Sequence, residues 1–422
     1  MKTVGVVGSG AAGLCAARHL LRSKLKPILF EQQDCVGGTW VYQDVDKNNS
    51  KDVFSSMYKN LRTNQPKEIM AFPDFPFPQS DSSYVHHTTV RDYLQLYAHH
   101  FNLLHHIRFN TKVTQISPCF MSQKEQRFVK WKIFFSDRSG KVSSEVFDGV
   151  VICNGHYSVP SYPCVTGLQH FTGKTMHSHY YRHADEFKDL TTLILGDGPS
   201  GSDIMLELSK QCASIYFSHR GNKTQSTLPL NVYEVDDISH VTEDGRFVFK
   251  DNNTAEIDVF IPCTGYKYYF PFLDNSSGVK VTGRIVENLY KHLFNIMYPS
   301  MAFVGVPWTI IPFPLYHQQC AYVSSIFSGC KRLPSFNEML KDIEMEKTQR
   351  LLCGEPTRYF HRMFYRQFQY NDELAKMSGF PKNKKIIENL YRYNMQLRET
   401  DLQGYKNRKY KILDDCDFEV ID

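Results

Sequence analysis

The sequence predicts an α/β protein with two Rossmann-like dinucleotide-binding domains, one inserted into the other. Two glycine-rich loops predict this fold class: residues 8–13 (GSGAAG) and residues 196–201 (GDGPSG), which begin 188 residues apart. Each loop lies between an apolar strand pattern and a helix pattern, which is the order that a dinucleotide-binding unit requires. One such loop is weak evidence, but two with correct flanks predict two dinucleotides on one chain.

The first loop joins the strand pattern of residues 3–7 to the helix pattern of residues 14–21. Gly8 permits the tight turn, Gly10 lets the backbone approach a pyrophosphate, and Gly13 allows the helix to pack against the strand. The free N–H groups and the dipole at the helix N-terminus attract the negative charge. This part of the chain is therefore expected to bind a nucleotide pyrophosphate.

The next strand pattern, residues 27–30, ends at Glu31, which is 18 residues after Gly13. A carboxylate at this distance binds the ribose hydroxyls of an unphosphorylated nucleotide such as FAD or NAD. The second loop repeats the architecture, with a strand at residues 192–195 and a helix at residues 202–208.

The strand that follows the second loop ends differently, in Ser218, His219 and Arg220. An arginine in this place binds the 2′-phosphate of NADP. We therefore expect FAD at the first loop and NADPH at the second. The predicted NADPH contacts are Gly196, Gly198, Ser200, Gly201, Ser218 and Arg220.

The position of the second loop in mid-chain predicts nested domains. We place an NADPH-binding domain at residues 160–290, inserted into an FAD-binding domain made from residues 1–159 and 291–422. The remaining expected elements are a strand at residues 258–266, a helix at 89–101, an antiparallel excursion around 128–134, and covering helices at 336–352 and 384–398.

The amino-acid composition argues against several classes of protein. The 422 residues are 42% hydrophobic and 22% charged, as in an ordinary globular protein, and the net charge of +5 is spread along the chain, so no nucleic-acid arm is predicted. The eleven cysteines include no closely spaced pair, which argues against a zinc ribbon and against a dithiol flavoenzyme. No metal site is expected; the histidines that we judge to lack metal-like partners are His19, His99, His100, His105 and His106.

No membrane attachment is expected. The most apolar long segment, residues 298–316, contains four prolines, and we interpret it as a strand followed by a rigid aromatic loop. The C-terminal residues are polar, and no secretory signal is visible at the N-terminus. We expect a cytoplasmic protein; a secreted form that has lost a signal peptide stays open, and so does a homo-oligomer.

Between the two loops, Phe171, Gly173, His177 and Tyr181 form the pattern F-x-G-x3-H-x3-Y. With this pattern the sequence resembles the flavin-containing monooxygenases over nearly the whole chain. The other stretches that carry the resemblance are residues 37–40 (GGTW), 61–70 (LRTNQPKEIM), 153–156 (CNGH) and 263–266 (CTGY).

The resemblance implies an NADPH- and O2-dependent enzyme that oxygenates nitrogen or sulfur in small nucleophilic, xenobiotic-like molecules, for example a tertiary amine alkaloid. In that family a C4a-hydroperoxyflavin transfers the oxygen, and the protein keeps water away from it. Related Baeyer-Villiger enzymes usually carry Trp followed by Pro or Asp where this chain has Tyr181 and Arg182. Heteroatom oxygenation is therefore favoured over ester formation.

The resemblance also assigns residues. Asn64 matches the family asparagine near the reactive flavin carbon, where its amide can donate to the bound oxygen and accept from the nicotinamide or ribose. Gly38 and Trp40 are expected to pack against FAD, and Thr63 and Gln65 to reach the cofactors. His177 is interpreted as a linker residue between the domains and not as a general base.

Three alternatives stay open: a Baeyer-Villiger or N-hydroxylating monooxygenase, an FAD- and NADPH-dependent oxidoreductase that does not oxygenate, and a binding protein that retains a nucleotide as a structural element.

Overall fold

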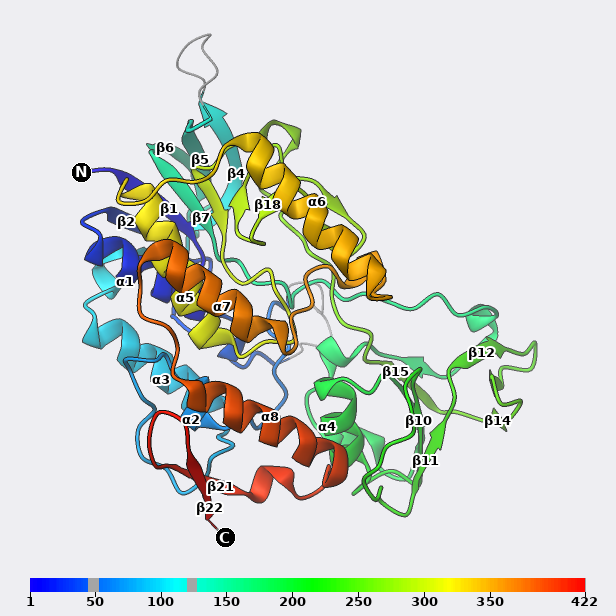
Figure 1. The fold of residues 1–422 in the computed structure, drawn as a ribbon. Coiled ribbons are helices and arrows are strands. Elements are labelled where there is room, and N and C mark those ends of the chain that lie inside the picture. Colours follow the sequence, from blue (N-terminus) through cyan, green and yellow to red (C-terminus); the bar gives the residue numbers. More distant parts are fainter. Residues whose placement is uncertain (45–52, 120–126, 422) are drawn as a thin grey trace.

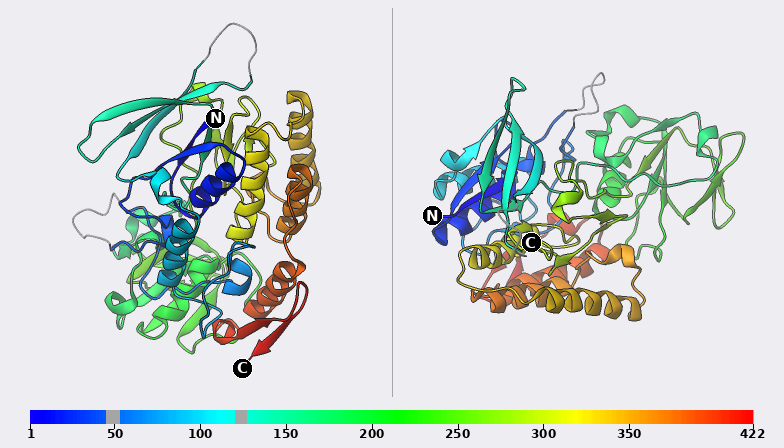
Figure 2. Two further views of the ribbon diagram at one scale, coloured as in Figure 1. Left: turned by 90° about the vertical axis from the view of Figure 1, so that its left-hand side faces the viewer. Right: turned by 90° about the horizontal axis from the view of Figure 1, so that it is seen from above.

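In the computed structural model, which describes residues 1–44, 53–119 and 127–421, two parallel sheets form two lobes of the molecule. Figure 1 shows the lobe that carries β1, β2 and β7 beside a smaller lobe that carries β10, β11 and β15. The view from above in Figure 2 shows the two lobes side by side, with the C-terminal helices along one side of both. The predicted fold class is confirmed.

The first sheet has seven strands and contains the first glycine loop. Its central strands are parallel, whereas the two strands at one edge form an antiparallel extension. The strand order is β18 (Leu289–Tyr290), β19 (Phe294–Asn295), β20 (Met301–Phe303), β7 (Gly149–Ile152), β1 (Thr3–Val7), β2 (Lys26–Phe30) and β3 (Ile107–Arg108).

The second sheet has five parallel strands and contains the second glycine loop. Its order is β11 (Val232–Val235), β10 (Ser214–Ser218), β9 (Thr191–Leu195), β15 (Val259–Pro262) and β8 (Lys174–Thr175). All of these strands lie in the sequence between β7 and β18 of the first sheet, so the second lobe is an insertion into the first. The domain boundaries at residues 159/160 and 290/291 stay a prediction.

Smaller antiparallel sheets complete both lobes. The predicted antiparallel excursion is a three-stranded sheet on the first lobe, and a second three-stranded sheet belongs to the inserted lobe. The bounds are β4 (Lys112–Cys119), β5 (Lys130–Ser136), β6 (Val142–Phe147), β12 (Ile238–Val241), β13 (Phe247–Phe249), β14 (Thr254–Ala255), and the hairpins β16 (Val281–Thr282) with β17 (Ile285–Val286) and β21 (Lys409–Ile412) with β22 (Phe418–Ile421).

The five helices expected from the sequence are present, whereas helices α2 and α7 were not predicted and one expected loop is helical. The segment expected to be a rigid loop after residue 303 enters helix α5 at Pro312, so that part of the prediction is wrong. Pro312 and Pro314 lie in the first helical turn, where a missing N–H costs nothing. The helices are α1 (Ala11–Arg22), α2 (Lys67–Met70), α3 (His87–His100), α4 (Pro199–Leu208), α5 (Pro312–Phe327), α6 (Phe336–Leu352), α7 (Arg366–Ser378) and α8 (Lys385–Thr400).

The two lobes share a hydrophobic core with the C-terminal part of the chain. Buried Ile204 and Leu208 of α4 belong to the same cluster as Leu390 and Tyr391 of α8. Figure 1 shows α8 passing below α7 toward α4. Because α8 packs on the inserted lobe, the end of the chain helps to hold the two lobes together.

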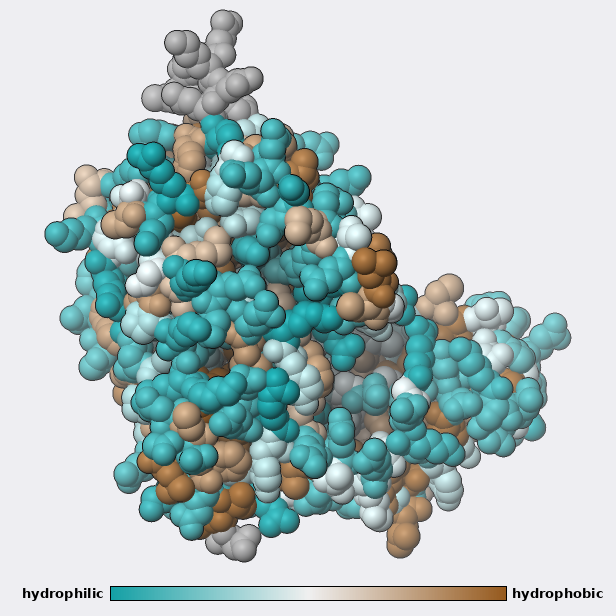
Figure 3. Space-filling model, viewed as in Figure 1, coloured by the Kyte–Doolittle hydropathy of each residue, from teal (hydrophilic) through white to brown (hydrophobic). Residues whose placement is uncertain are grey.

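The face of the molecule in Figure 3 is mostly hydrophilic, with small separate hydrophobic groups. One group lies near the C-terminal end of α6, where Leu352 is 84% exposed. In the described ranges, no helix combines the length and the apolar character that crossing a bilayer requires.

Candidate active site

The first glycine loop is tightly packed and covered. A Cβ on Gly13 would lie 2.0 Å from the Gly8 carbonyl oxygen, which is too close for any other residue. Gly10 lies against Gly38, because a Cβ on Gly38 would be 3.0 Å from the Cα of Gly10. The predicted tight turn at Gly8 and the predicted helix packing at Gly13 are therefore present at this loop, and residues 37–38 form its cover. The approach of Gly10 to a pyrophosphate stays a prediction.

Glu31 is fixed beside the loop by its neighbours. Its side chain is buried, and Oε2 accepts hydrogen bonds from the Ser9 backbone N–H at 2.8 Å and the Ser9 hydroxyl at 2.9 Å. Oε1 accepts from the Gln33 backbone N–H at 2.9 Å. The carboxylate therefore keeps one orientation at the end of β2, where a ribose would meet it.

The second loop has the same backbone but a different surface. A Cβ on Gly201 would lie 1.8 Å from the Gly196 carbonyl oxygen, which repeats the relation between Gly13 and Gly8. A Cβ on Gly198, in contrast, would meet no atom of the described residues within 4 Å. Asp197, Gly198, Pro199 and Ser200 are all exposed. The second loop is therefore open where the first is covered.

A positive group lies beyond the second loop at the end of β10. The Arg220 guanidinium contacts Asp237 at 2.9 Å, and the Lys250 ammonium contacts the same carboxylate at 3.2 Å. Two cations on one anion leave a net positive charge, and the Arg220 side chain is 77% exposed. Ser218 is fully buried and its hydroxyl donates to the Asp236 carbonyl, so in this structure it supports the strand end.

The segment of residues 55–65 crosses from one loop to the other. At its start the Ser55 hydroxyl donates to the Thr39 carbonyl at 2.8 Å, next to the cover of the first loop. Further along, the Tyr58 hydroxyl donates to Asp203 of α4 at 3.0 Å. Burial, and then the Asp203 charge, raises the pKa of Tyr58 well above its usual value, so this hydroxyl stays a donor. The segment thus connects both nucleotide loops.

Asn64 lies at the end of this segment and is braced by the C-terminal helix α8. The fully buried amide of Asn394 donates to the Asn64 carbonyl at 3.1 Å and to Gln65 Oε1 at 3.0 Å. Asn394 Oδ1 in turn accepts from the Tyr84 hydroxyl at 2.5 Å. The Asn64 side-chain amide has no hydrogen-bond partner in the described part of the chain. Its backbone is therefore fixed while its side chain is available to a ligand.

Thr63 is buried beside Asn64, and its backbone N–H donates to the Val85 carbonyl at 2.9 Å. Its Oγ1 has no partner among the residues described. A buried hydroxyl without a partner is costly, so this atom fits a position that contacts a bound group.

The motif that ends in Tyr181 lies at the junction of the lobes. His177 is fully buried, and burial lowers its pKa to about 4, so it is neutral near pH 7. Its Nδ1 accepts from the His179 backbone N–H at 3.0 Å, and its ring packs edge-on against Tyr266 at 5.5 Å. Tyr181 is also fully buried. These positions fit the linker role predicted for His177.

Arg182 follows the motif and holds several backbone carbonyls. Its Nε donates to the Gln43 carbonyl at 2.7 Å and Nη2 to the Ser55 carbonyl at 3.0 Å. Its Nη1 donates to the carbonyls of His179 and Tyr181. Arg182 therefore ties the start of the connecting segment to the linker between the lobes.

The two connections between the lobes pair with each other. The Ser161 N–H donates to the Gly265 carbonyl and the Lys267 N–H to the Val159 carbonyl, each at 2.9 Å. The Thr264 hydroxyl adds a bond to the Ser161 carbonyl at 2.5 Å. The lobes are thus joined by a short double-stranded connection and not by two separate tethers.

The prediction that His19 lacks metal-like partners is wrong. His19 is buried, and its Nε2 lies 3.2 Å from Nδ1 of His317. The sequence could not show this contact because the two residues are 298 positions apart. His99, His100 and His105 are exposed, as expected for solvated side chains.

Comparison with known proteins decides the family. The model of the flavin-binding monooxygenase-like family matches residues 1–227 and 224–390. The chain belongs to this family.

Its relatives include two proteins of Arabidopsis thaliana. The flavin-containing monooxygenase FMO GS-OX-like 4 is 36% identical over 92% of this chain and 90% of its own length, and FMO GS-OX5 is 37% identical over 90% and 85%. Among solved structures, S-allyl-L-cysteine S-oxygenase from Allium sativum has a TM-score of 0.88 and 33% identity, covering 96% of this chain and 95% of that one. Tmm from Pelagibacter sp. strain HTCC7211 has a TM-score of 0.82 and 27% identity, covering 97% and 93%.

This monooxygenase uses FAD and NADPH, and its residues fit both. Within the described residues, no side chain caps the N-terminus of α1 or α4 and no acid lies in either first turn, so both helix ends offer free N–H groups to a pyrophosphate. At the first loop Glu31 would hold the adenosine ribose. At the second, Arg220 and Lys250 would hold the 2′-phosphate that distinguishes NADPH from NADH.

The monooxygenase therefore combines predicted and unpredicted site residues. The structure brings the predicted Gly8, Gly10, Gly13, Glu31 and Gly38 together at one loop, and the predicted Gly196, Gly198, Ser200 and Gly201 at the other, with Arg220 beyond it. It stays a prediction that a cofactor contacts Trp40, Gln65 and Ser218. In this structure Trp40 packs against the core of the first lobe, and Gln65 accepts a hydrogen bond from Asn394. Sequence reasoning missed Ser9, Arg182 and Asn394, whose roles depend on distant partners.

Proposed function

We propose that this monooxygenase transfers one oxygen atom of O2 to the sulfur of a small thioether, with nitrogen in small amines as the second acceptor. In the balanced reaction, the thioether, O2, NADPH and one proton give the sulfoxide, water and NADP⁺. FAD, reduced by NADPH, supplies the activation of O2. The chain supplies binding, orientation and exclusion of water.

The proposal rests on one observation. The segment of residues 55–65 connects the two nucleotide loops, and Asn394 fixes its backbone at Asn64. An amide whose backbone is fixed and whose side chain is available can donate to an oxygen atom next to the flavin ring. Fixed donors of this kind need no rearrangement when charge develops, which is how a site stabilises a reactive oxygen.

The same surroundings do not favour a general base at His177. A buried imidazole with a pKa of about 4 gains a proton only at acidic pH. Transfer of oxygen to a lone pair needs no proton abstraction from the substrate. The neutral, packed state of His177 is therefore compatible with oxygenation of sulfur or nitrogen.

Similarity to known proteins favours sulfur as the atom that accepts the oxygen. The solved structure with a TM-score of 0.88 is an oxygenase of the sulfur in S-allyl-L-cysteine. The likeness to cyclohexanone monooxygenase, at 15% identity and a TM-score of 0.62, concerns the fold alone. The Tyr181 and Arg182 pair also argues against a Baeyer-Villiger enzyme.

The experiment supplies the purified FAD-loaded enzyme with NADPH and oxygen-18 gas. The substrates are S-allyl-L-cysteine, methyl phenyl sulfide, trimethylamine and cyclohexanone, tested separately. We expect labelled sulfoxides to form faster than labelled N-oxide, with no lactone. Lactone as the main product would establish the Baeyer-Villiger alternative. Consumption of NADPH with hydrogen peroxide as the sole product from every substrate would overturn the proposal.

Asn64→Ala tests the role of the amide. We expect the variant to retain bound FAD and to oxidise NADPH, while the sulfoxide formed per NADPH falls about tenfold or more because a donor to the activated oxygen is lost. The readout is the ratio of sulfoxide to hydrogen peroxide. The control is Asn60→Ala, an exposed residue of the same segment that donates to Glu207 at 2.7 Å. Full coupling in Asn64→Ala would remove Asn64 from the chemistry.

A further inference from the structure

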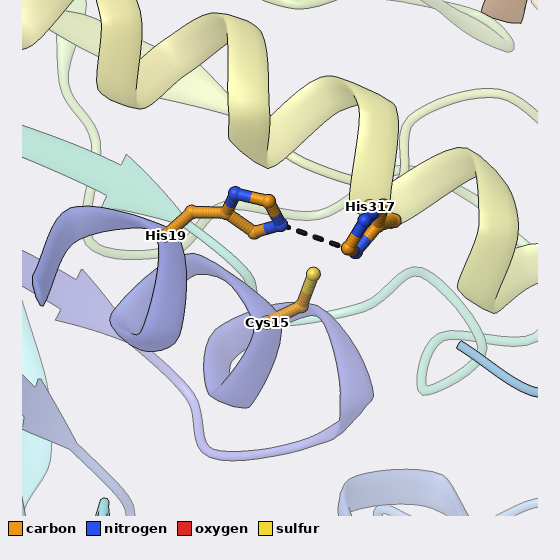
Figure 4. A group of neighbouring side chains, drawn as sticks. All are labelled: Cys15, His19 and His317. Carbon is orange, nitrogen blue, oxygen red and sulfur yellow. Dashed lines mark hydrogen bonds between the residues drawn. The ribbon is translucent and has the colours of Figure 1, made fainter. Parts of the chain in front are cut away.

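Helices α1 and α5 bring together a group of side chains that the oxygenation chemistry does not use. Cys15 and His19 of α1 and His317 of α5 are all buried, and one possible ligand atom from each lies within 4.8 Å of the others. Figure 4 shows the Cys15 sulfur pointing toward the gap between the two imidazole rings. Sulfur and imidazole nitrogen are the ligands that zinc prefers in proteins.

The spacing of these residues places two ligands on each helix. Cys15 and His19 are four residues apart, so they lie one turn apart on the same face of α1. On α5, Cys320 follows His317 by three residues and also faces the group. Cys320 is buried, and its Sγ lies 3.9 Å from the carbonyl oxygen of Ala12, one turn before Cys15 on α1. Three ligand atoms, from Cys15, His19 and His317, therefore already lie within 4.8 Å of one another, and Cys320 is the candidate for the fourth ligand.

The observed distance between the histidines matches a tetrahedral ion. His19 Nε2 and His317 Nδ1 are 3.2 Å apart. A zinc ion that binds two imidazoles at about 2.0–2.1 Å holds their nitrogens about 3.3–3.4 Å apart in tetrahedral geometry. The separation of the two nitrogens is therefore compatible with both rings binding one ion. The Cys15 sulfur is already within 4.8 Å of both nitrogens.

The surroundings are those of a closed site. The Phe380 ring packs edge-on against His19 at 5.3 Å and against His317 at 5.0 Å. Leu14, Val323 and other apolar residues of the same core surround the two helices. An ion with four protein ligands here would have no open position for a substrate, so the site is structural in type.

We propose that Cys15, His19, His317 and Cys320 bind one Zn²⁺ ion that joins α1 to α5. Binding displaces the thiol protons of the two cysteines, so both bind as thiolates. Because the N-terminus of α1 carries the first nucleotide loop, the ion fastens the helix that holds the FAD pyrophosphate to the C-terminal helices.

The first test is the metal content of the protein itself. The enzyme is produced in zinc-supplemented medium, purified without a histidine tag under reducing conditions, and analysed by elemental mass spectrometry. We expect about one zinc per chain, as in other structural zinc sites. Replacing zinc by Co²⁺ should give thiolate-to-cobalt absorption and tetrahedral cobalt bands at wavelengths beyond the flavin. No zinc in the purified protein, together with no such bands after addition of Co²⁺, overturns the proposal.

Two variants locate the ion. Cys15→Ser and His317→Gln keep the approximate size of each side chain but are poor zinc ligands, and we expect each to lower the zinc content about tenfold or more. Cys212→Ser is the matched control, because Cys212 is also a buried thiol but lies in the inserted lobe, near Thr192. Zinc content that is unchanged in both variants would place the metal elsewhere and overturn the proposal.

A third measurement does not depend on the variants folding. A zinc chelator added to the wild-type holoenzyme should lower the melting temperature and speed the release of FAD, and added Zn²⁺ should restore both. If the protein contains zinc but its complete removal changes neither quantity, the ion does not fasten α1 and that part of the proposal fails.

Discussion

The two nucleotide loops have the same backbone but different surroundings. The first is covered by residues 37–38 and has Glu31 locked beside it, whereas Asp197 to Ser200 of the second are exposed and Gly198 faces open space. A covered loop suits a cofactor that stays bound through every cycle, and an open loop suits one that must enter and leave. The difference in packing thus matches FAD as the resident cofactor and NADPH as the exchanging one.

The largest effect is expected from adding one methyl group to either loop. Gly13→Ala and Gly201→Ala both force a Cβ against a backbone carbonyl, at 2.0 Å and 1.8 Å. Each clash should cost about 2–4 kcal/mol locally. We expect Gly13→Ala to lose FAD and to fold poorly, whereas Gly201→Ala keeps its yellow flavin but is reduced by NADPH at least about thirtyfold more slowly, since that cost raises the barrier.

Absorbance spectra and anaerobic reduction by NADPH and by dithionite measure this difference. Dithionite should reduce Gly201→Ala normally because it does not need the second loop. Equal loss of FAD from both variants would contradict the assignment of a resident cofactor to the first loop and an exchanging cofactor to the second.

The next effect concerns the segment between the loops. In Asn394→Leu, the Gln65 amide oxygen and the Tyr84 hydroxyl both lose their buried partner, which should destabilise the protein by about 2–4 kcal/mol. We expect nearly normal binding of both nucleotides but more peroxide per NADPH, because Asn64 is no longer held. Urea unfolding and the peroxide ratio are the measurements. Asn389→Leu is the control, because Asn389 is a half-buried residue of the same helix whose amide donates to the Cys416 carbonyl and not to Gln65 or Tyr84.

Acid should destabilise the junction of the lobes. The folded pKa of His177 is about 4, below its unfolded value of about 6.5, so its contribution is present above pH 6.5 and is lost as the pH falls toward 4. Between pH 7 and pH 5 the wild type should lose about 2 kcal/mol through this residue.

His177→Asn should lose less stability over the same pH interval, although it is less stable than the wild type at pH 7. Urea unfolding at both pH values tests this, with the exposed His99→Asn as control. An equal loss in wild type and His177→Asn would show that this histidine does not couple the junction to pH.

The smallest effect is expected at the open loop. Arg220→Ala removes one of two cations near the expected 2′-phosphate, which should raise the KM for NADPH about tenfold, or about 1.4 kcal/mol, and leave that for NADH unchanged. Steady-state kinetics with both nucleotides measure the change. Arg246→Ala is the control, since Arg246 is in the same lobe but pairs with Asp244 and Glu256. An equal rise for both nucleotides would mean that Arg220 does not contact the phosphate.

The sequence predicted those parts of the fold and the site that depend on residues close together in the chain. The strand, loop and helix around Gly8 and around Gly196 were visible because their residues are adjacent in sequence, and so was the contrast between Glu31 and Arg220. The brace at Asn394 was not, because its partner Asn64 lies 330 residues away. Residues 312–316 were wrongly predicted to be a loop for another reason. Proline breaks the interior of a helix but is also common in its first turn, and the sequence pattern did not distinguish these two positions.

The inserted lobe has a consequence for how the protein folds during synthesis. All strands of the second sheet have been made once residue 262 has left the ribosome, but the first sheet waits for β20, in which Ala302 pairs with Val151. Domains fold as units in order of emergence. The sheet of the NADPH lobe can therefore form first, although its packing against α8 comes later. Until β20 is made, the edge of β7 that will pair with it carries unpaired backbone N–H and C=O groups. Asn64 gains its brace only when α8 arrives, so the residue that we propose to act in oxygenation is the last to be fixed.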